Sequence, residues 1–152
     1  MSVRTPPIRP GGTRSKLVEA ALQAAKDSNG KHYKWGGKTT EGFDCSGFVS
    51  YVYAKVFPTF TYLDTKNLEC GTHFSAVQTP QPGDLIFFGA GVNPYEVKRG
   101  NRKEFPAHVG IVLDASSWIG SQSSTGAAVV PMANPWWAAR TRTFLKYAGV
   151  DE

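Results

Sequence analysis

The chain has 152 residues, enough for one domain that buries roughly 70% of the surface its unfolded chain would expose. A hydrophobic content of 41%, a charged content of 19% and an aromatic content of 12% exclude a disordered or fibrous protein. The net charge of +5 favours encounters with polyanions, but the basic residues are scattered apart from a cluster in 98–103, and no segment has the pattern of a basic recognition helix. We therefore expect no nucleic-acid partner.

The cellular location is constrained by what the sequence lacks. The first 16 residues contain no apolar run of the length found in signal peptides, and no stretch approaches the ~18 residues of a membrane span. We expect a protein made in the cytoplasm without a signal peptide or transmembrane segment, unless a leader is missing from this sequence. Cys45 and Cys70 are too few for a disulfide framework, which predicts free thiols.

The N-terminal part predicts an arm followed by a helix. Residues 1–12 hold three prolines and two glycines without periodicity, which predicts a flexible arm before a single domain at 13–152. The helix has Thr13 or Ser15 as its N-cap and ends at Asn29-Gly30. Its apolar stripe consists of Leu17, Ala21, Ala24 and Ala25, widened by Val18 and Leu22. Residues 32–42 then form a glycine-rich loop.

A second helix begins at Cys45. Its apolar positions repeat at helical spacing, and Pro58 ends the pattern. These positions are Phe48, Val49, Val52, Tyr53 and Val56. Residues 59–82 carry a weaker pattern, in which we expect a short helix near 72–78.

The second half of the chain predicts strands. A turn at 81–84 leads into a buried strand at 85–89, and a long loop at 89–106 follows. Three segments joined by tight turns, at 108–114, 118–122 and 127–132, indicate an antiparallel meander. Residues 134–140 form a loop or one helical turn, and 142–150 could close the sheet as a last strand. Two helices ahead of a block of strands predict an α+β domain.

The setting of Cys45 predicts a nucleophile. A cysteine attacks as a thiolate, and a helix N-terminus lowers the pKa of a thiol because its N–H groups and macrodipole favour negative charge. A nearby imidazole would take the proton. Of His32, His73 and His108, we favour His108, because it opens a strand at the mouth of the sheet, where a side chain can face a helix terminus.

Four motifs occur in order along the chain. They are YKWGG (33–37), GFDCSGFVSYVY (42–53), QPGDLIFF (81–88) and HVGIVLD (108–114). Together they resemble the NlpC-type family of papain-like cysteine peptidases, which cut bacterial cell-wall peptides, over about residues 13–137. The resemblance implies a papain-like fold with N-terminal helices packed on a central antiparallel β-sheet, and it implies no metal or cofactor.

The resemblance also implies roles for individual residues. Cys45 matches the nucleophile, His108 matches the general base, and Tyr33 matches a tyrosine whose hydroxyl shapes the surroundings of the nucleophile. The backbone N–H of Cys45 and a second donor such as Tyr33 would hold the oxyanion. Asp44 and Ser46 match positions that contact the amino end of the peptide, although Asp44 also suits an N-cap. The substrate-binding candidates are Tyr33, Trp35, Asp44 and Ser46.

The third catalytic position departs from the family. A polar residue that orients the base, usually a histidine, would fall at Gly120, and glycine cannot orient an imidazole. Residues two apart in a strand share a face, so Gln122 lies on the side that the missing histidine would use. Its amide oxygen can accept from the imidazole N–H. We therefore predict Gln122 as the third catalytic residue, with Ser121 as the second choice.

The resemblance implies a peptidoglycan hydrolase that cuts an amide bond in the stem peptide, usually the bond between D-glutamate and the diamino acid. Because the wall lies outside the cytoplasm, we expect an exported antibacterial toxin acting in the periplasm or cell wall of a target bacterium. A secretion-machine component and an immunity protein would be its partners. A phage-type lysin, or a papain-like acyltransferase or amidase with a non-wall substrate, are the alternatives.

Overall fold

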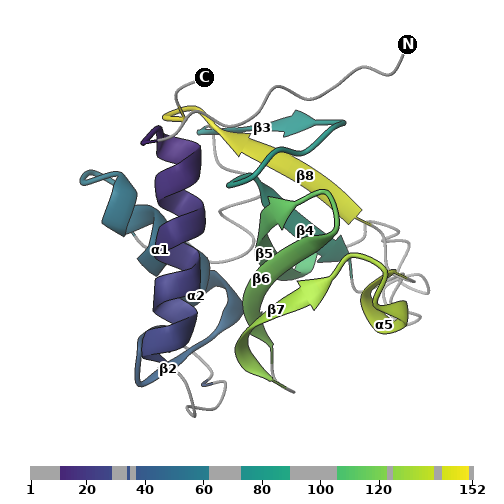
Figure 1. Cartoon of the computed structure of the whole chain (residues 1–152), viewed down its shortest axis with the longest axis horizontal. Coiled ribbons are helices and arrows are strands. Elements are labelled where there is room, and N and C mark those ends of the chain that lie inside the picture. Colours follow the sequence, from purple (N-terminus) through teal and green to yellow (C-terminus); the bar gives the residue numbers. More distant parts are fainter. Residues whose placement is uncertain are drawn as a thin grey trace, which may run out of the picture.

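The computed structural model describes residues 11–28, 34, 37–61, 73–89, 106–122, 125–138 and 142–150. The elements in chain order are α1 (Thr13–Asp27), β1 (Lys38–Thr39), β2 (Gly42–Phe43), α2 (Cys45–Val56), β3 (Phe74–Val77), β4 (Leu85–Gly89), β5 (Pro106–Asp114), β6 (Ser117–Gln122), β7 (Gly126–Pro131), α5 (Pro135–Ala138) and β8 (Arg142–Tyr147). Figure 1 shows α1 and α2 on one side of a twisted sheet and α5 on the other. This is the predicted α+β architecture.

The main sheet has six antiparallel strands in the order β3-β8-β4-β5-β6-β7, and β1 and β2 form a separate hairpin. The predicted meander is confirmed as β5, β6 and β7. The last strand, β8, is not at the end of this meander but between β3 and β4, and it pairs with both. The sequence predicts a strand there but not its neighbours, because those pairings join segments far apart in the chain.

The helices cover one face of the sheet and bury most of the core. Leu17, Ala21 and Ala24 of α1 are buried as predicted, and α2 buries Phe48, Val49, Val52 and Tyr53. Leu22, predicted to widen the stripe of α1, is instead 45% exposed. One residue advances about 100° around a helix, so Leu22 turns away from the narrow face that Ala21 presents to the core.

Three local predictions are corrected. The N-cap of α1 is Gly12, not Thr13 or Ser15, and Thr13 is the first helical residue. The segment 32–42, expected as a loop, contains β1, and β2 begins at its last residue and pairs with β1. The segment 72–78, expected as a helix, contains β3 at 74–77, because pairing with β8 satisfies its backbone hydrogen bonds.

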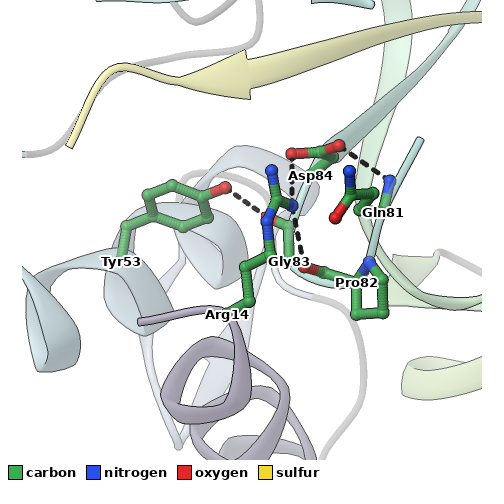
Figure 2. Close-up of polar contacts among 6 residues, drawn as sticks. All are labelled: Arg14, Tyr53, Gln81, Pro82, Gly83 and Asp84. Carbon is green, nitrogen blue, oxygen red and sulfur yellow. Dashed lines mark hydrogen bonds and ion pairs between the residues drawn. The ribbon is translucent and has the colours of Figure 1, made fainter. Parts of the chain in front are cut away.

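A buried cluster that the sequence pattern missed joins both helices to the turn before β4 (Figure 2). Arg14 donates from Nη1 to the carbonyl of Pro82 at 3.0 Å and to Oδ1 of Asp84 at 2.8 Å. Oδ2 of Asp84 accepts from the backbone N–H of Gln81 at 2.8 Å, and the Tyr53 hydroxyl donates to the carbonyl of Gly83. Gly83 has a φ of +94°, which favours glycine in this turn. We call these residues the helix–turn clasp.

Burial governs the titration of the clasp. It raises the pKa of Asp84 above the ordinary value of 3.8, although the Gln81 N–H and the Arg14 guanidinium pull that pKa down. Burial also raises the pKa of Tyr53 well above 10.0, with a further contribution from the Asp84 charge. The tyrosine therefore acts as a neutral hydroxyl donor.

Some predictions fall outside the described residues, so the structure does not bear on them. These concern residues 1–10 of the arm, His32, Tyr33, Trp35, Cys70 and the basic segment within 90–105. Within the described ranges, none of the helices combines the length and the apolar character needed to cross a bilayer.

Candidate active site

The N-terminus of α2 presents Cys45 at the first helical position. Asp44 is the N-cap, and its Oδ1 accepts from the backbone N–H of Gly47 at 2.5 Å and from the Ser46 hydroxyl at 3.2 Å. The capping role of Asp44 is thus confirmed. Cys45 forms no disulfide with any residue that the structure describes, and it is 8% exposed. Its thiol lies where first-turn N–H groups and the helix dipole stabilise a thiolate.

The residue before β1 packs against the N-terminus of α2. The N–H of Asp44 donates to the carbonyl of Gly37 at 3.0 Å. A Cβ on Gly47 would lie 1.9 Å from the same carbonyl oxygen, so only glycine permits this approach. The glycine of the Cys-Ser-Gly motif is therefore explained by its close packing on the Gly37 carbonyl, two residues after Cys45.

His108 and Gln122 meet across β5 and β6. The register of β5 and β6 is set by the pairs Ile111–Ile119 and Val112–Trp118. If the same register is extended along the two strands, residue 108 lies opposite residue 122. Nε2 of His108 lies 3.2 Å from Oε1 of Gln122, and both side chains are buried. An amide oxygen only accepts, so Nε2 carries the proton and donates it. In the neutral ring, Nδ1 is then the proton acceptor.

Gly120 makes room for this contact. A Cβ on Gly120 would lie 2.8 Å from Oε1 of Gln122 and 3.1 Å from Cζ3 of Trp118. A larger residue at 120 would therefore displace the carboxamide or the indole. The glycine that departs from the family pattern and the glutamine two residues later belong to one arrangement.

Ser121, the second choice for the third catalytic residue, has a different contact. Its hydroxyl donates to the carbonyl of Phe43 at 2.7 Å, and the residue is 1% exposed. Adjacent strand residues point to opposite faces, so Ser121 faces β2 and Gln122 faces His108. The end of β6 thus contacts both His108 and the residue that precedes Asp44, while α2 packs on β5 and β6.

An aromatic cluster surrounds the imidazole. His108 stacks on Trp137 of α5, with ring centroids 4.7 Å apart and an interplanar angle of 28°. Trp118 meets the imidazole edge-on at 5.8 Å, and the Phe88 centroid lies 6.2 Å away. Sequence reasoning did not identify Trp137 as a neighbour of His108. Only the docking of α5 on the sheet brings the two together.

His73, the other histidine that the structure describes, lies far along the sheet from His108. His73 precedes β3 at an edge of the sheet, and β8 and β4 separate that strand from β5. Among the residues that the structure describes, no group of three or more His, Cys, Asp or Glu could hold a metal ion.

Comparison with known proteins identifies the fold. The sequence model of the NlpC/P60 family matches residues 30–146. The chain belongs to this family. Two relatives are the probable peptidoglycan endopeptidase LytE of Bacillus subtilis, 32% identical over 123 residues, and the murein DD-endopeptidase MepS/murein LD-carboxypeptidase of Escherichia coli K12, 30% identical over 118 residues.

These NlpC/P60 relatives are longer than this chain. The matched segments cover 81% and 75% of this chain but only 32% of LytE and 54% of MepS. The chain therefore corresponds to one part of each.

Solved structures agree with the family assignment. The NlpC/p60 domain of the peptidoglycan hydrolase SagA superimposes with a TM-score of 0.57 at 27% identity, covering 89% of this chain and 98% of that domain. NlpC2 from Trichomonas vaginalis gives a TM-score of 0.64 at 15% identity, covering 97% of this chain and 50% of that one. The predicted NlpC-type, papain-like fold is thereby confirmed.

Proposed function

We propose that this chain is a cysteine peptidase that hydrolyses an amide bond in the stem peptide of peptidoglycan. The observation that carries the proposal is the buried His108, whose Nε2 is engaged by Gln122 in a sheet packed against the helix that begins with Cys45. The names of the NlpC/P60 relatives, which are peptidoglycan and murein endopeptidases, support this substrate class.

In the proposed reaction, Nδ1 of His108 takes the thiol proton and the thiolate of Cys45 attacks the amide carbonyl. The oxyanion would be held by the backbone N–H of Cys45 and by Tyr33. Collapse of the tetrahedral intermediate breaks the C–N bond, and the imidazolium returns its proton to the leaving amine. Water, deprotonated by His108, then hydrolyses the thioester and regenerates the thiol. Throughout, Gln122 accepts from Nε2 and stabilises the imidazolium.

The substrate contacts are also proposals. Asp44 and Ser46 would bind the amino end of the peptide, with Tyr33 and Trp35 on the neighbouring segment. Asp44 and Ser46 are 8% and 4% exposed, so a peptide would reach them only at their exposed edges. The bond between D-glutamate and the diamino acid is the proposed target.

The first experiment identifies the bond. Diaminopimelate-type peptidoglycan is incubated with the protein, with Cys45→Ala and with His108→Ala, and the soluble fragments are analysed by mass spectrometry. We expect new fragments with the wild type only, with masses that identify the cleaved bond. Intact muropeptides in every sample would reject the peptidase assignment and favour an acyltransferase or amidase with another substrate.

We further propose that the protein acts as an exported antibacterial toxin, with a secretion-machine component and an immunity protein as partners. The net charge of +5 suits an anionic wall. The chain is expressed in bacteria either in the cytoplasm or behind a periplasmic leader, with Cys45→Ala as the control. We expect lysis only for the periplasmic wild type. Harmlessness there would count against a wall target, whether for a toxin or for a phage-type lysin.

A further inference from the structure

The hydrogen-bonded chain that starts at His108 continues past Gln122. Nε2 of Gln122 donates to the Thr125 hydroxyl at 3.0 Å, and that hydroxyl donates to the carbonyl of Gly126 at 2.8 Å. A hydroxyl has one proton, so while Thr125 donates it to a carbonyl it can only accept from the amide. The contact therefore fixes which end of the carboxamide faces which neighbour.

The orientation of the carboxamide matters because its two ends have opposite hydrogen-bonding character. With the oxygen toward His108, Nε2 carries the proton and Nδ1 can accept the thiol proton. If the amide were rotated by half a turn, its NH₂ group would face Nε2, which would then act as acceptor and leave the proton on Nδ1. That tautomer cannot deprotonate a thiol through Nδ1.

We propose that Thr125 is a positioning residue whose hydroxyl holds the Gln122 carboxamide in one orientation and thereby selects the Nε2–H tautomer of His108. Its catalytic meaning rests on the proposed peptidase function, but the tautomer can be measured without substrate.

The turn between β6 and β7 keeps Thr125 in place. Its N–H donates to the carbonyl of Gln122 at 3.2 Å, and Gln122 pairs with Gly126 in the β6–β7 register. Gly126 has a φ of +68°, a conformation that favours glycine. Thr125 itself is exposed, whereas Gln122 is 2% exposed, so substitution of the threonine removes a partner of the buried amide without opening the core.

The first test reads the tautomer by NMR of ¹⁵N-histidine-labelled protein, in which the two ring nitrogens of His108 have distinct shifts. We expect the Nε2–H form in the wild type and in Thr125→Ser, and an added Nδ1–H population in Thr125→Val, which has the same shape without the hydroxyl. A Thr125→Val protein that keeps the Nε2–H form alone would overturn the proposal.

The second test is a double-mutant cycle with Gln122→Glu, because a carboxylate accepts at both oxygens and has no wrong orientation. The readout is the alkylation rate of Cys45 by iodoacetamide as a function of pH. With Gln122 present, we expect Thr125→Val to slow alkylation about tenfold, the effect of losing one net hydrogen bond. The acidic limb of the rate–pH profile should also move to higher pH, because an NH₂ group facing Nε2–H disfavours the imidazolium that stabilises the thiolate.

In the Gln122→Glu background we expect Thr125→Val to change the rate far less, and Thr125→Ser to behave like the wild type in both backgrounds. An equal loss in the two backgrounds would show a merely structural role and reject the proposal. Because neither test uses peptidoglycan, a protein with the expected tautomer and cycle but no hydrolysis would contradict the proposed function and leave this inference standing.

Discussion

The helix–turn clasp and the network at His108 are both buried and polar, yet they are built from different chemistry. The clasp pairs two charges, Arg14 and Asp84, which are 4% and 1% exposed and 70 residues apart in the chain. The network at His108 instead uses a neutral carboxamide against an imidazole 14 residues away. A permanent ion pair suits a structural contact that attaches α1 to the turn before β4. A neutral acceptor suits the proposed general base, whose charge would change in each catalytic cycle.

The largest effect is expected from breaking the clasp on one side. Arg14→Met leaves the Asp84 carboxylate buried without its counter-charge, which costs about 3–5 kcal/mol of unfolding free energy. Urea denaturation measures this loss. The double variant Arg14→Met/Asp84→Leu should recover a large part of it, because well-packed apolar pairs replace buried ion pairs at little cost. A double variant no more stable than the single one would contradict this account.

The loss of unfolding free energy in Arg14→Met should depend on pH. Burial raises the pKa of Asp84 above 3.8, so the folded protein binds the carboxyl proton more tightly than the unfolded chain does. The stabilisation of the fold by this proton is complete at pH values below 3.8, and it is lost as the pH rises through the raised pKa. Removing Arg14 removes two contributions that lower this pKa. We therefore expect the destabilisation by Arg14→Met to be largest at neutral pH and to shrink on acidification. A loss independent of pH would contradict this expectation.

A smaller effect, on rate instead of stability, is expected at the end of β6. Gln122→Ala removes the acceptor of the imidazolium and should lower kcat/KM about ten- to hundredfold, the value of a hydrogen bond to a charged group. Ser121→Ala is the matched control on the opposite face of the strand, where it loses the bond to Phe43 and about 1 kcal/mol of stability. Unchanged hydrolysis by Gln122→Ala would remove this residue from the mechanism.

Substitutions of Trp137 test whether the aromatic ring stacked on His108 supports the reactivity of Cys45. Trp137→Leu removes the ring stacked on His108, a contact worth about 0.5–1.5 kcal/mol, and should slow Cys45 alkylation several-fold. Trp137→Phe keeps an aromatic face against the imidazole and should retain most of the rate. Equal rates for the leucine and phenylalanine variants would show that the stacking itself does not support the base.

The smallest effect is expected at Asp114, an exposed carboxylate at the end of β5. Hydrogen bonds from the Ser116 N–H and the Ser117 hydroxyl lower its pKa below 3.8, so the stability it provides is present above 3.8 and is lost as the pH falls through the lowered pKa. Asp114→Ala should cost under about 1 kcal/mol at neutral pH, since surface contacts are weak. Thermal unfolding of the two proteins should converge on acidification, because the stabilising contribution of Asp114 is lost as the pH falls.

The sequence by itself determined the elements whose signals are local. Helical spacing predicted α2 and its start at Cys45, and turn residues with apolar runs predicted β4, β5, β6 and β7. Period-two alternation placed Gln122 on one face, and the structure puts it against His108. Such patterns can be recognised in the sequence because each depends on residues within a single element.

Only the tertiary structure decided the contacts between distant segments. It placed β8 inside the sheet, made 74–77 a strand, buried Arg14 against Asp84, and brought Trp137 and Thr125 into the network of His108. The physical reason is that a lone arginine, threonine or tryptophan has no periodic pattern of its own. Its partner is determined by strand order, by turn geometry and by the docking of helices, which depend on the whole chain at once.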